Sequence, residues 1–183
     1  MLIDARKSFL LMVDMQERLL AATSGAEAAE RGCALLLKAA RIMGLPVLAS
    51  EQYPKGLGHT VHALREELGN APILEKVEFS CWRNEALRAE LIRLHEAGRP
   101  QAILAGIEAH VCLLQTALDL AAAGFSVFAV ADAMTSRSPH SVALAQGRMT
   151  HAGVAVANAE MVVFELLGRA GTAEFKALSA LVR

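Results

Sequence analysis

The sequence predicts an α/β protein of three layers, in which a doubly wound, six-stranded and mainly parallel sheet lies between helices. Short apolar runs alternate with longer helical patterns along the chain. The runs are apolar at consecutive positions, which is typical of parallel strands that are buried on both faces. Glycine and proline stand at several of the breaks between segments, where turns need them. Right-handed crossovers then place helices on both faces of a Rossmann-like sheet.

The apolar runs predict six strands. These are Phe9–Val13, Val47–Ala49, Ile73–Leu74, Ala102–Ala105, Val127–Ala131 and Val154–Val156. Apolar residues at helical spacing predict the connecting and C-terminal helices. These are Ala28–Met43, Val61–Leu68, Asn84–Glu96, His110–Ala123, Ser141–His151, Ala159–Leu167 and Thr172–Leu181. The turns Gly44-Leu45-Pro46 and Gly98-Arg99-Pro100, together with Gly124 and Gly153, follow four of these helices and explain why they stop there.

Length and composition predict one globular domain over residues 1–183. Of the 183 residues, 54% are hydrophobic and 20% are charged, so the chain is long and apolar enough to build a core. The formal charge is −1, which gives no basic excess for nucleic acid or an anionic membrane. The apolar runs are too short to span a bilayer. We expect a protein with neither nucleic acid nor membrane as a partner.

Two further features bear on location. The N-terminal segment Met1–Gln16 carries charges within its first seven residues and only a short apolar run, unlike a signal peptide. The three cysteines, Cys33, Cys81 and Cys112, form no CxxC pair. An odd set without such spacing favours free thiols in a reducing compartment. We therefore expect a cytoplasmic protein.

One expected helix is apolar on nearly every side. Within His110–Ala123 the polar interruptions are Gln115, Thr116 and Asp119. Such a helix is buried on more than one face. We expect part of that burial to come from a second subunit, in a homo-oligomer that is a dimer or a tetramer.

Polar residues follow three of the strands, where each strand ends. Asp14 follows the first, Lys76 the third, and Cys112 lies in the first helical turn after the fourth. Ligand sites of doubly wound sheets lie at this edge. A helix start and a nearby ammonium lower the pKa of a thiol, a carboxylate can take its proton, and backbone N–H groups can hold an oxyanion. The constellation predicts acyl transfer through a thioester.

Each of these residues also has a structural reading. Cysteine often packs as a small hydrophobic residue, and this is the expectation for Cys33 and, because it stands near the site, less clearly for Cys81. Asp14 at a strand end can cap a turn, and Lys76 can be a solvated loop charge. Proximity in the fold decides between the two readings.

The chain resembles the isochorismatase-like, or cysteine hydrolase, superfamily over nearly its whole length. The matching segments are Val13–Gln16, Glu75-Lys76, Gly106–Cys112, Gln115–Ala117, Ala131–Ala133 and Ser136-Arg137. The order acid, lysine, cysteine at these spacings is the specific part of the match. The loop Glu51–Gly58 and the C-terminal segments Met161–Leu167 and Phe175-Lys176 resemble the isochorismatase-domain-containing branch.

The resemblance implies a catalytic triad of Asp14, Lys76 and Cys112. Cys112 is then the nucleophile, Asp14 the general base and acid, and Lys76 the group that holds both anions. It also implies a cis peptide bond between Ile107 and Glu108. That bond would aim the N–H of Glu108, together with that of Cys112, at the oxyanion. No cofactor is required.

A metal site is not expected. In the nicotinamidase branch an Asp and histidines after the second strand bind a metal, whereas the corresponding segment here, Ser50–Pro54, has no Asp-x-His unit. His59 and His62 are three residues apart and could face one way on a helix. Two histidines without a third ligand make a weak zinc site, so we expect them to be solvated or packed.

The substrate pocket is expected in the loops after the second and third strands. Tyr53, Phe79 and Trp82 lie there and could form an apolar wall. Trp82 and Phe79 could equally fill the core beneath the loop.

Further pocket candidates are polar. Gln16 stands near the first strand end, and Arg137 or Arg83 could recognise a substrate carboxylate through a bidentate contact. His110 stands two residues before Cys112 and could shape the pocket or act as a base in a Cys–His pair.

The function expected from all of this is hydrolysis of a small amide or related acyl compound. Two alternatives stay open. One is hydrolysis of a vinyl ether as in isochorismate, which does not need the cysteine. The other is a non-catalytic, redox-responsive or interaction protein, in which Cys112 is an oxidisable thiol.

Overall fold

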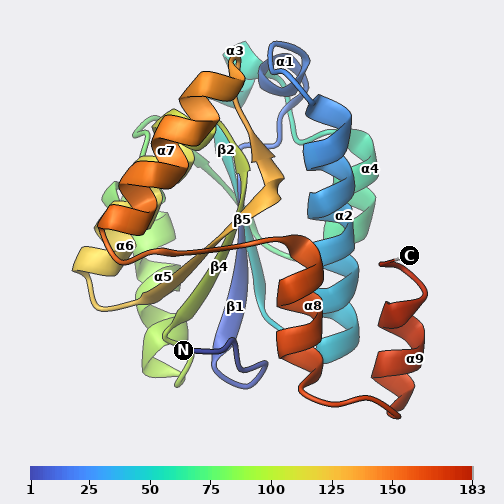
Figure 1. Ribbon diagram of the computed structural model, residues 1–183. Coiled ribbons are helices and arrows are strands. Elements are labelled where there is room, and N and C mark those ends of the chain that lie inside the picture. Colours follow the sequence, from blue (N-terminus) through green and yellow to red (C-terminus); the bar gives the residue numbers. More distant parts are fainter. Residues whose placement is uncertain (183) are drawn as a thin grey trace.

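The computed structural model describes residues 1–182 and contains one six-stranded sheet in the order β3-β2-β1-β4-β5-β6 (Figure 1). Every pair of neighbouring strands is parallel. The strands are β1 (Ser8–Val13), β2 (Val47–Gln52), β3 (Ile73–Lys76), β4 (Gln101–Ile107), β5 (Ser126–Thr135) and β6 (Ala155–Ala157). The predicted fold class is confirmed. Arg183, the last residue of the predicted domain, lies outside the described residues.

The helices follow the predicted pattern, with two additions. They are α1 (Glu17–Ala21), α2 (Ala26–Met43), α3 (Pro54–Leu57), α4 (His62–Leu68), α5 (Glu85–Glu96), α6 (Leu114–Ala122), α7 (Pro139–His151), α8 (Ala159–Leu167) and α9 (Ala173–Ser179). The short helices α1 and α3 were not predicted, because one turn is too short to show a periodicity. Within residues 1–182 no helix has the length and apolar character needed to cross a bilayer.

The sheet separates two apolar cores. Leu10 and Met12 of β1 point to the core under α2, α4 and α8, whereas Phe9, Leu11 and Val13 point to the core under α5, α6 and α7. Figure 1 shows these two sets of helices on opposite sides of the sheet. Alternate residues of a strand face opposite sides, so burial on both sides explains the continuous apolar runs.

The expected long helix after β4 is divided and is partly covered by the chain itself. A π-helical turn, η2 (Ala109–Leu113), precedes α6. Leu114, Ala117 and Leu120 of α6 are buried in the core between the sheet and α7. Val111 and Leu118 are only partly buried, so the contribution of a second subunit to the burial of this helix stays a prediction.

The carboxyl ends of β1 and β4 approach each other closely. Gly106 has a φ of +124°, and a side chain at this position would collide with the carbonyl oxygen of Val13. Only glycine combines this positive φ with so close an approach to the neighbouring strand. This approach lies at the point where the strand order reverses, beside the segments that carry Asp14 and Cys112.

Candidate active site

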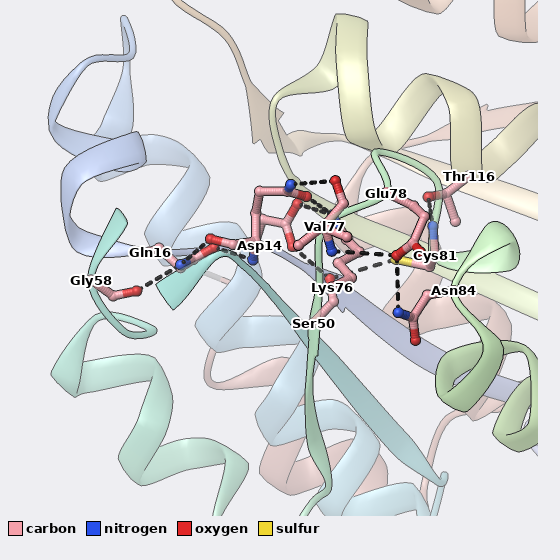
Figure 2. A network of polar contacts seen from close by, with 11 residues as sticks. Asp14, Gln16, Ser50, Gly58, Lys76, Val77, Glu78, Cys81, Asn84 and Thr116 are labelled. Carbon is pink, nitrogen blue, oxygen red and sulfur yellow. Dashed lines mark hydrogen bonds and ion pairs between the residues drawn. The ribbon is translucent and has the colours of Figure 1, made fainter. Parts of the chain in front are cut away.

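Asp14 lies directly after β1 and is fully buried. Its φ of +50° is unusual for a residue with a side chain. Ser50 Oγ donates a hydrogen bond of 2.7 Å to Asp14 Oδ1, and Lys76 Nζ donates one of 2.6 Å to Oδ2 (Figure 2). Both carboxylate oxygens therefore accept a hydrogen bond from a neighbouring side chain.

Lys76 is the last residue of β3, and its side chain is fully buried. The Nζ atom also donates to Gln52 Oε1, at 2.7 Å. Burial alone would lower the pKa of this ammonium, but the charge of the Asp14 carboxylate and its hydrogen bond, with contributions from Cys81 and Cys112, outweigh burial and hold the pKa above its usual value. Lys76 is thus a buried, charged group aimed at Asp14.

Cys112 lies in η2, with 6% of its surface exposed. Burial raises the pKa of its thiol, the Asp14 carboxylate raises it further, and the Lys76 ammonium opposes both. The sequence-based expectation of a lowered thiol pKa is therefore wrong for Cys112.

Cys81, in the turn η1 (Cys81–Arg83), is part of the same network. Its Sγ lies 3.5 Å from Ser50 Oγ, and its backbone N–H donates to Thr116 Oγ1 at 3.0 Å. Burial, followed by the charge of Asp14, raises the pKa of this thiol to about 11. The sequence indicated packing for Cys81, and the structure adds contact with Ser50.

Gln16 holds the chain around the site together. Its Oε1 accepts from the Gln52 N–H at 2.6 Å, and its Nε2 donates to the carbonyls of Gln52 and Gly58 at 3.0 and 2.6 Å. The side chain is buried. Gln16 was expected in the substrate pocket, but its amide is occupied by backbone groups, so it positions the loop after β2.

The three aromatic candidates separate in the structure. Tyr53 and Phe79 are 55% and 53% exposed, whereas Trp82 is half-buried and packs edge-to-face on Phe125 with ring centroids 5.8 Å apart. A cavity of about 280 Å³ adjoins the site on the side of β3. It is lined by Tyr53, Pro54, Lys55, Glu75, Lys76, Val77 and Asn84. Of the three aromatic residues, Tyr53 alone is part of this lining, and Trp82 fills the core beneath the loop.

The polar candidates near η2 already have partners. His110 Nδ1 lies 3.0 Å from Ser136 Oγ. Arg137 Nε donates to Glu108 Oε1 at 2.8 Å, and 64% of the arginine side chain is exposed. The peptide bond between Ile107 and Glu108 is cis.

Arg83, the other arginine, pairs with Asp119 of α6. Its Nε donates to Asp119 Oδ2 at 2.8 Å. This contact ties η1 to the helix that follows Cys112.

The two histidines after β2 do not converge. His59 Nδ1 lies 2.9 Å from Glu51 Oε2, whereas His62 Nε2 contacts Glu66 at 3.2 Å. Within the part of the chain that the structure describes, no group of three His, Cys, Asp or Glu side chains is arranged to hold a metal ion.

Sequence reasoning missed Ser50 and Gln52. It ended the second strand at Ala49, whereas β2 continues through Gln52. Their signal was a pair of polar residues directly after the predicted strand, at the same edge as Asp14. Placing them needed the register between β1 and β2, in which Val13 lies beside Ser50.

The fold and this site together define an α/β protein of the isochorismatase-like hydrolase type, with a buried lysine–carboxylate pair beside a thiol. The family model of the isochorismatase domain matches residues 8–161. The chain therefore belongs to the isochorismatase family.

Relatives and solved structures agree with this assignment. Isochorismatase domain-containing protein 1 of Salmo salar is 41% identical over 148 residues, covering 81% of this chain and 51% of that protein. The chain thus spans about half the length of that relative. The structure of the MAR1 ribonuclease from Caenorhabditis elegans is similar, with a TM-score of 0.92 and 36% identity, over 100% of this chain and 92% of that one.

A third comparison is with the YcaC gene product of Escherichia coli, described as an octameric hydrolase of unknown specificity. Its structure has a TM-score of 0.90 and 25% identity, covering 98% of this chain and 90% of that one. The hydrolase fold is shared across these proteins.

Proposed function

We propose that this protein is a cysteine-dependent hydrolase of a small amide or a related acyl compound. The observation that carries the proposal is the buried contact of 2.6 Å between Lys76 Nζ and Asp14 Oδ2, beside the Cys112 thiol. Burying two charges costs free energy, and catalysis gives a reason to retain them. The proposed triad is Asp14, Lys76 and Cys112.

In the first half of the reaction Asp14 takes the thiol proton, and the Cys112 thiolate attacks the substrate carbonyl carbon. The C–N bond breaks, and the proton on Asp14 passes to the leaving amine. The substrate acyl group is then joined to Cys112 as a thioester. The N–H groups of Glu108 and Cys112 are the proposed donors to the oxyanion.

In the second half Asp14 takes a proton from water, and the resulting hydroxide attacks the thioester carbonyl. The C–S bond breaks, the acid is released, and the proton returns from Asp14 to the Cys112 sulfur. Lys76 remains protonated throughout, because its raised pKa fits a fixed positive charge. No cofactor takes part in this sequence.

The test uses p-nitrophenyl acetate as a generic acyl probe, with mass spectrometry of the peptide that contains Cys112. In the wild type we expect a transient acetyl adduct on Cys112. Cys112→Ala should give no adduct and lose turnover by at least about 100-fold, the size typical of a lost nucleophile. Asp14→Asn should let the adduct accumulate, because water is no longer activated.

Wild-type turnover in Cys112→Ala would exclude the thioester route. If turnover of isochorismate were then lost in Asp14→Asn, the vinyl-ether alternative would be favoured. If neither substitution changed any hydrolysis, the protein would be better described as an interaction protein.

The ribonuclease from C. elegans suggests RNA as a second candidate substrate class. It is 36% identical to this chain over 100% of this chain and 92% of the ribonuclease chain. An RNA phosphodiester has no acyl carbon for Cys112 to attack. We therefore expect end-labelled RNA to stay intact in the presence of the protein. Cleavage that is lost in Cys112→Ala would favour RNA as the substrate instead.

We also propose that the protein is cytoplasmic and forms a homo-oligomer. Three free cysteines, all buried, suit a reducing compartment. The octamer described for the E. coli protein supports self-association.

A further inference from the structure

Ser50 contacts Asp14 twice. Within the sheet it lies beside Val13, and its carbonyl oxygen accepts the Asp14 backbone N–H at 3.1 Å. Its hydroxyl donates to Asp14 Oδ1 at 2.7 Å. Only 1% of Ser50 is exposed, so water does not replace either contact.

The direction of the Ser50 hydroxyl is fixed by Cys81. A serine hydroxyl has one hydrogen, and here it is used in the bond to Asp14. The Cys81 sulfur, 3.5 Å from the same oxygen, must therefore be the donor in its own contact. Thr116, one turn after Cys112, holds Cys81 in this place through the backbone N–H. The hydrogen bonds thus run in one direction, from Cys81 through Ser50 to Asp14 (Figure 2).

We propose that Ser50 is a positioning residue whose hydrogen bond to Asp14 opposes transfer of the Cys112 proton to that carboxylate and so limits how much of Cys112 is a thiolate before substrate binds. This inference rests on the proposed function, because it assigns the proton exchange to Asp14 and Cys112. A hydrogen bond to the charged form of a carboxylate favours that form. The proton therefore stays on the Cys112 sulfur in the free protein and moves to Asp14 only during attack.

Every charged or titratable group that faces Asp14 enters this balance. Lys76 at the end of β3 favours a thiolate at Cys81 in η1 and at Cys112 in η2, whereas burial and the Asp14 carboxylate disfavour it. Ser50 of β2 is the member of the set that does not titrate. Substituting it changes the balance without changing the net charge of the site, which makes it the informative position.

The experiment measures the rate at which iodoacetamide alkylates Cys112 between about pH 5 and pH 10, by mass spectrometry of its peptide. Ser50→Ala removes this hydrogen-bond donor, so transfer of the Cys112 proton to Asp14 becomes more favourable and more of Cys112 is thiolate. We expect alkylation at pH 7 to be roughly tenfold faster, the value of one hydrogen bond to a charged group. Asp14→Asn should accelerate it in the same direction and further.

Two other variants separate positioning from structural damage. Ser50→Thr retains the hydroxyl and should keep the wild-type pH profile. Cys81→Ala leaves Ser50 in place but removes the group that orients it, and we expect a smaller acceleration, about two- to threefold. Ultraviolet absorbance of the thiolate, corrected with the same protein carrying Cys112→Ala, should be highest in Asp14→Asn, lower in Ser50→Ala and lowest in Cys81→Ala.

Two outcomes are adverse. If Ser50→Ala and Cys81→Ala both keep the wild-type profile while Asp14→Asn accelerates alkylation, the inference about Ser50 is wrong and the proposed triad stands. If Asp14→Asn and Lys76→Met also leave the profile unchanged, Cys112 is not coupled to either group, and both proposals are wrong.

Discussion

Lys76 and Asp14 form the contact on which the site depends, and both side chains are fully buried. The desolvation of such a pair opposes its mutual attraction. The additional bonds from Ser50 to Asp14 and from Lys76 to Gln52 satisfy the remaining polar atoms. Removing either side chain would therefore leave the other as a buried charge without its partner.

We expect the pair to show strong coupling in a double-mutant cycle. Asp14→Asn or Lys76→Met alone leaves one buried charge without a partner and should lower the free energy of unfolding by about 3–5 kcal/mol. The double variant should lose clearly less than the sum of the two. Urea unfolding at pH 7 measures all three.

The matched control for that cycle is the exposed pair of Arg93 and Glu90, 2.7 Å apart. Arg93→Met should cost less than about 1 kcal/mol. Additive losses for Asp14 and Lys76 would show that the two charges act independently in the folded protein.

The loop between β2 and α4 is anchored to the sheet by one buried carboxylate. Glu51 Oε1 accepts from the Thr60 N–H and Oγ1 at 2.6 and 2.8 Å, and Oε2 contacts His59 Nδ1 at 2.9 Å. Because this loop carries Tyr53 and the cavity beside Lys76, the anchor positions the proposed substrate side of the site.

The anchor should depend on pH. Burial would raise the pKa of Glu51, but the hydrogen bonds from Thr60 and His59 outweigh it and hold the pKa below the ordinary value of 4.5. Its stabilisation is therefore complete above pH 4.5 and is lost as pH falls through the lower, folded-state value.

We expect Glu51→Gln to lower the free energy of unfolding by about 1–3 kcal/mol at pH 7. The difference from wild type should shrink as the pH is lowered below about 4. Urea unfolding at several pH values measures this. Glu75→Gln, at an exposed position on the neighbouring strand, should show no such trend, and an equal trend in both variants would contradict the anchor.

The strand order decides how the whole molecule assembles its site. Because β1 lies between β2 and β4, residues that are far apart in the sequence meet at one edge of the sheet. The outer surface keeps several large apolar side chains at least 40% exposed, among them Tyr53, Val77, Phe79, Leu144, Met161 and Phe164. Exposed apolar groups of this kind mark surfaces for association when they are contiguous.

We expect sedimentation equilibrium at micromolar concentration to give two or four times the mass of the chain. The physical reason is that association removes these apolar side chains from water. If the measured mass remained that of a single chain as the protein concentration was raised, the proposed homo-oligomer would be contradicted.

The sequence alone was enough to predict the sheet, the two layers of helices and the positions of Asp14, Lys76 and Cys112 at strand ends. These depend on apolar periodicity and on local turn residues, which a sequence displays directly. It also determined the family, through the order of the acid, the lysine and the cysteine.

The surroundings of those residues depend on the folded chain and could not be predicted from the sequence. Ser50 lies beside Val13 because β1 and β2 pair in register, and its hydroxyl meets Cys81, which is 31 residues away in the sequence. Gln16 binds backbone groups. The sequence also could not predict the direction of the Cys112 pKa shift, because that direction depends on burial and on the competing charges of Asp14 and Lys76. Side-chain environments are set by packing between distant segments, and no local pattern records them.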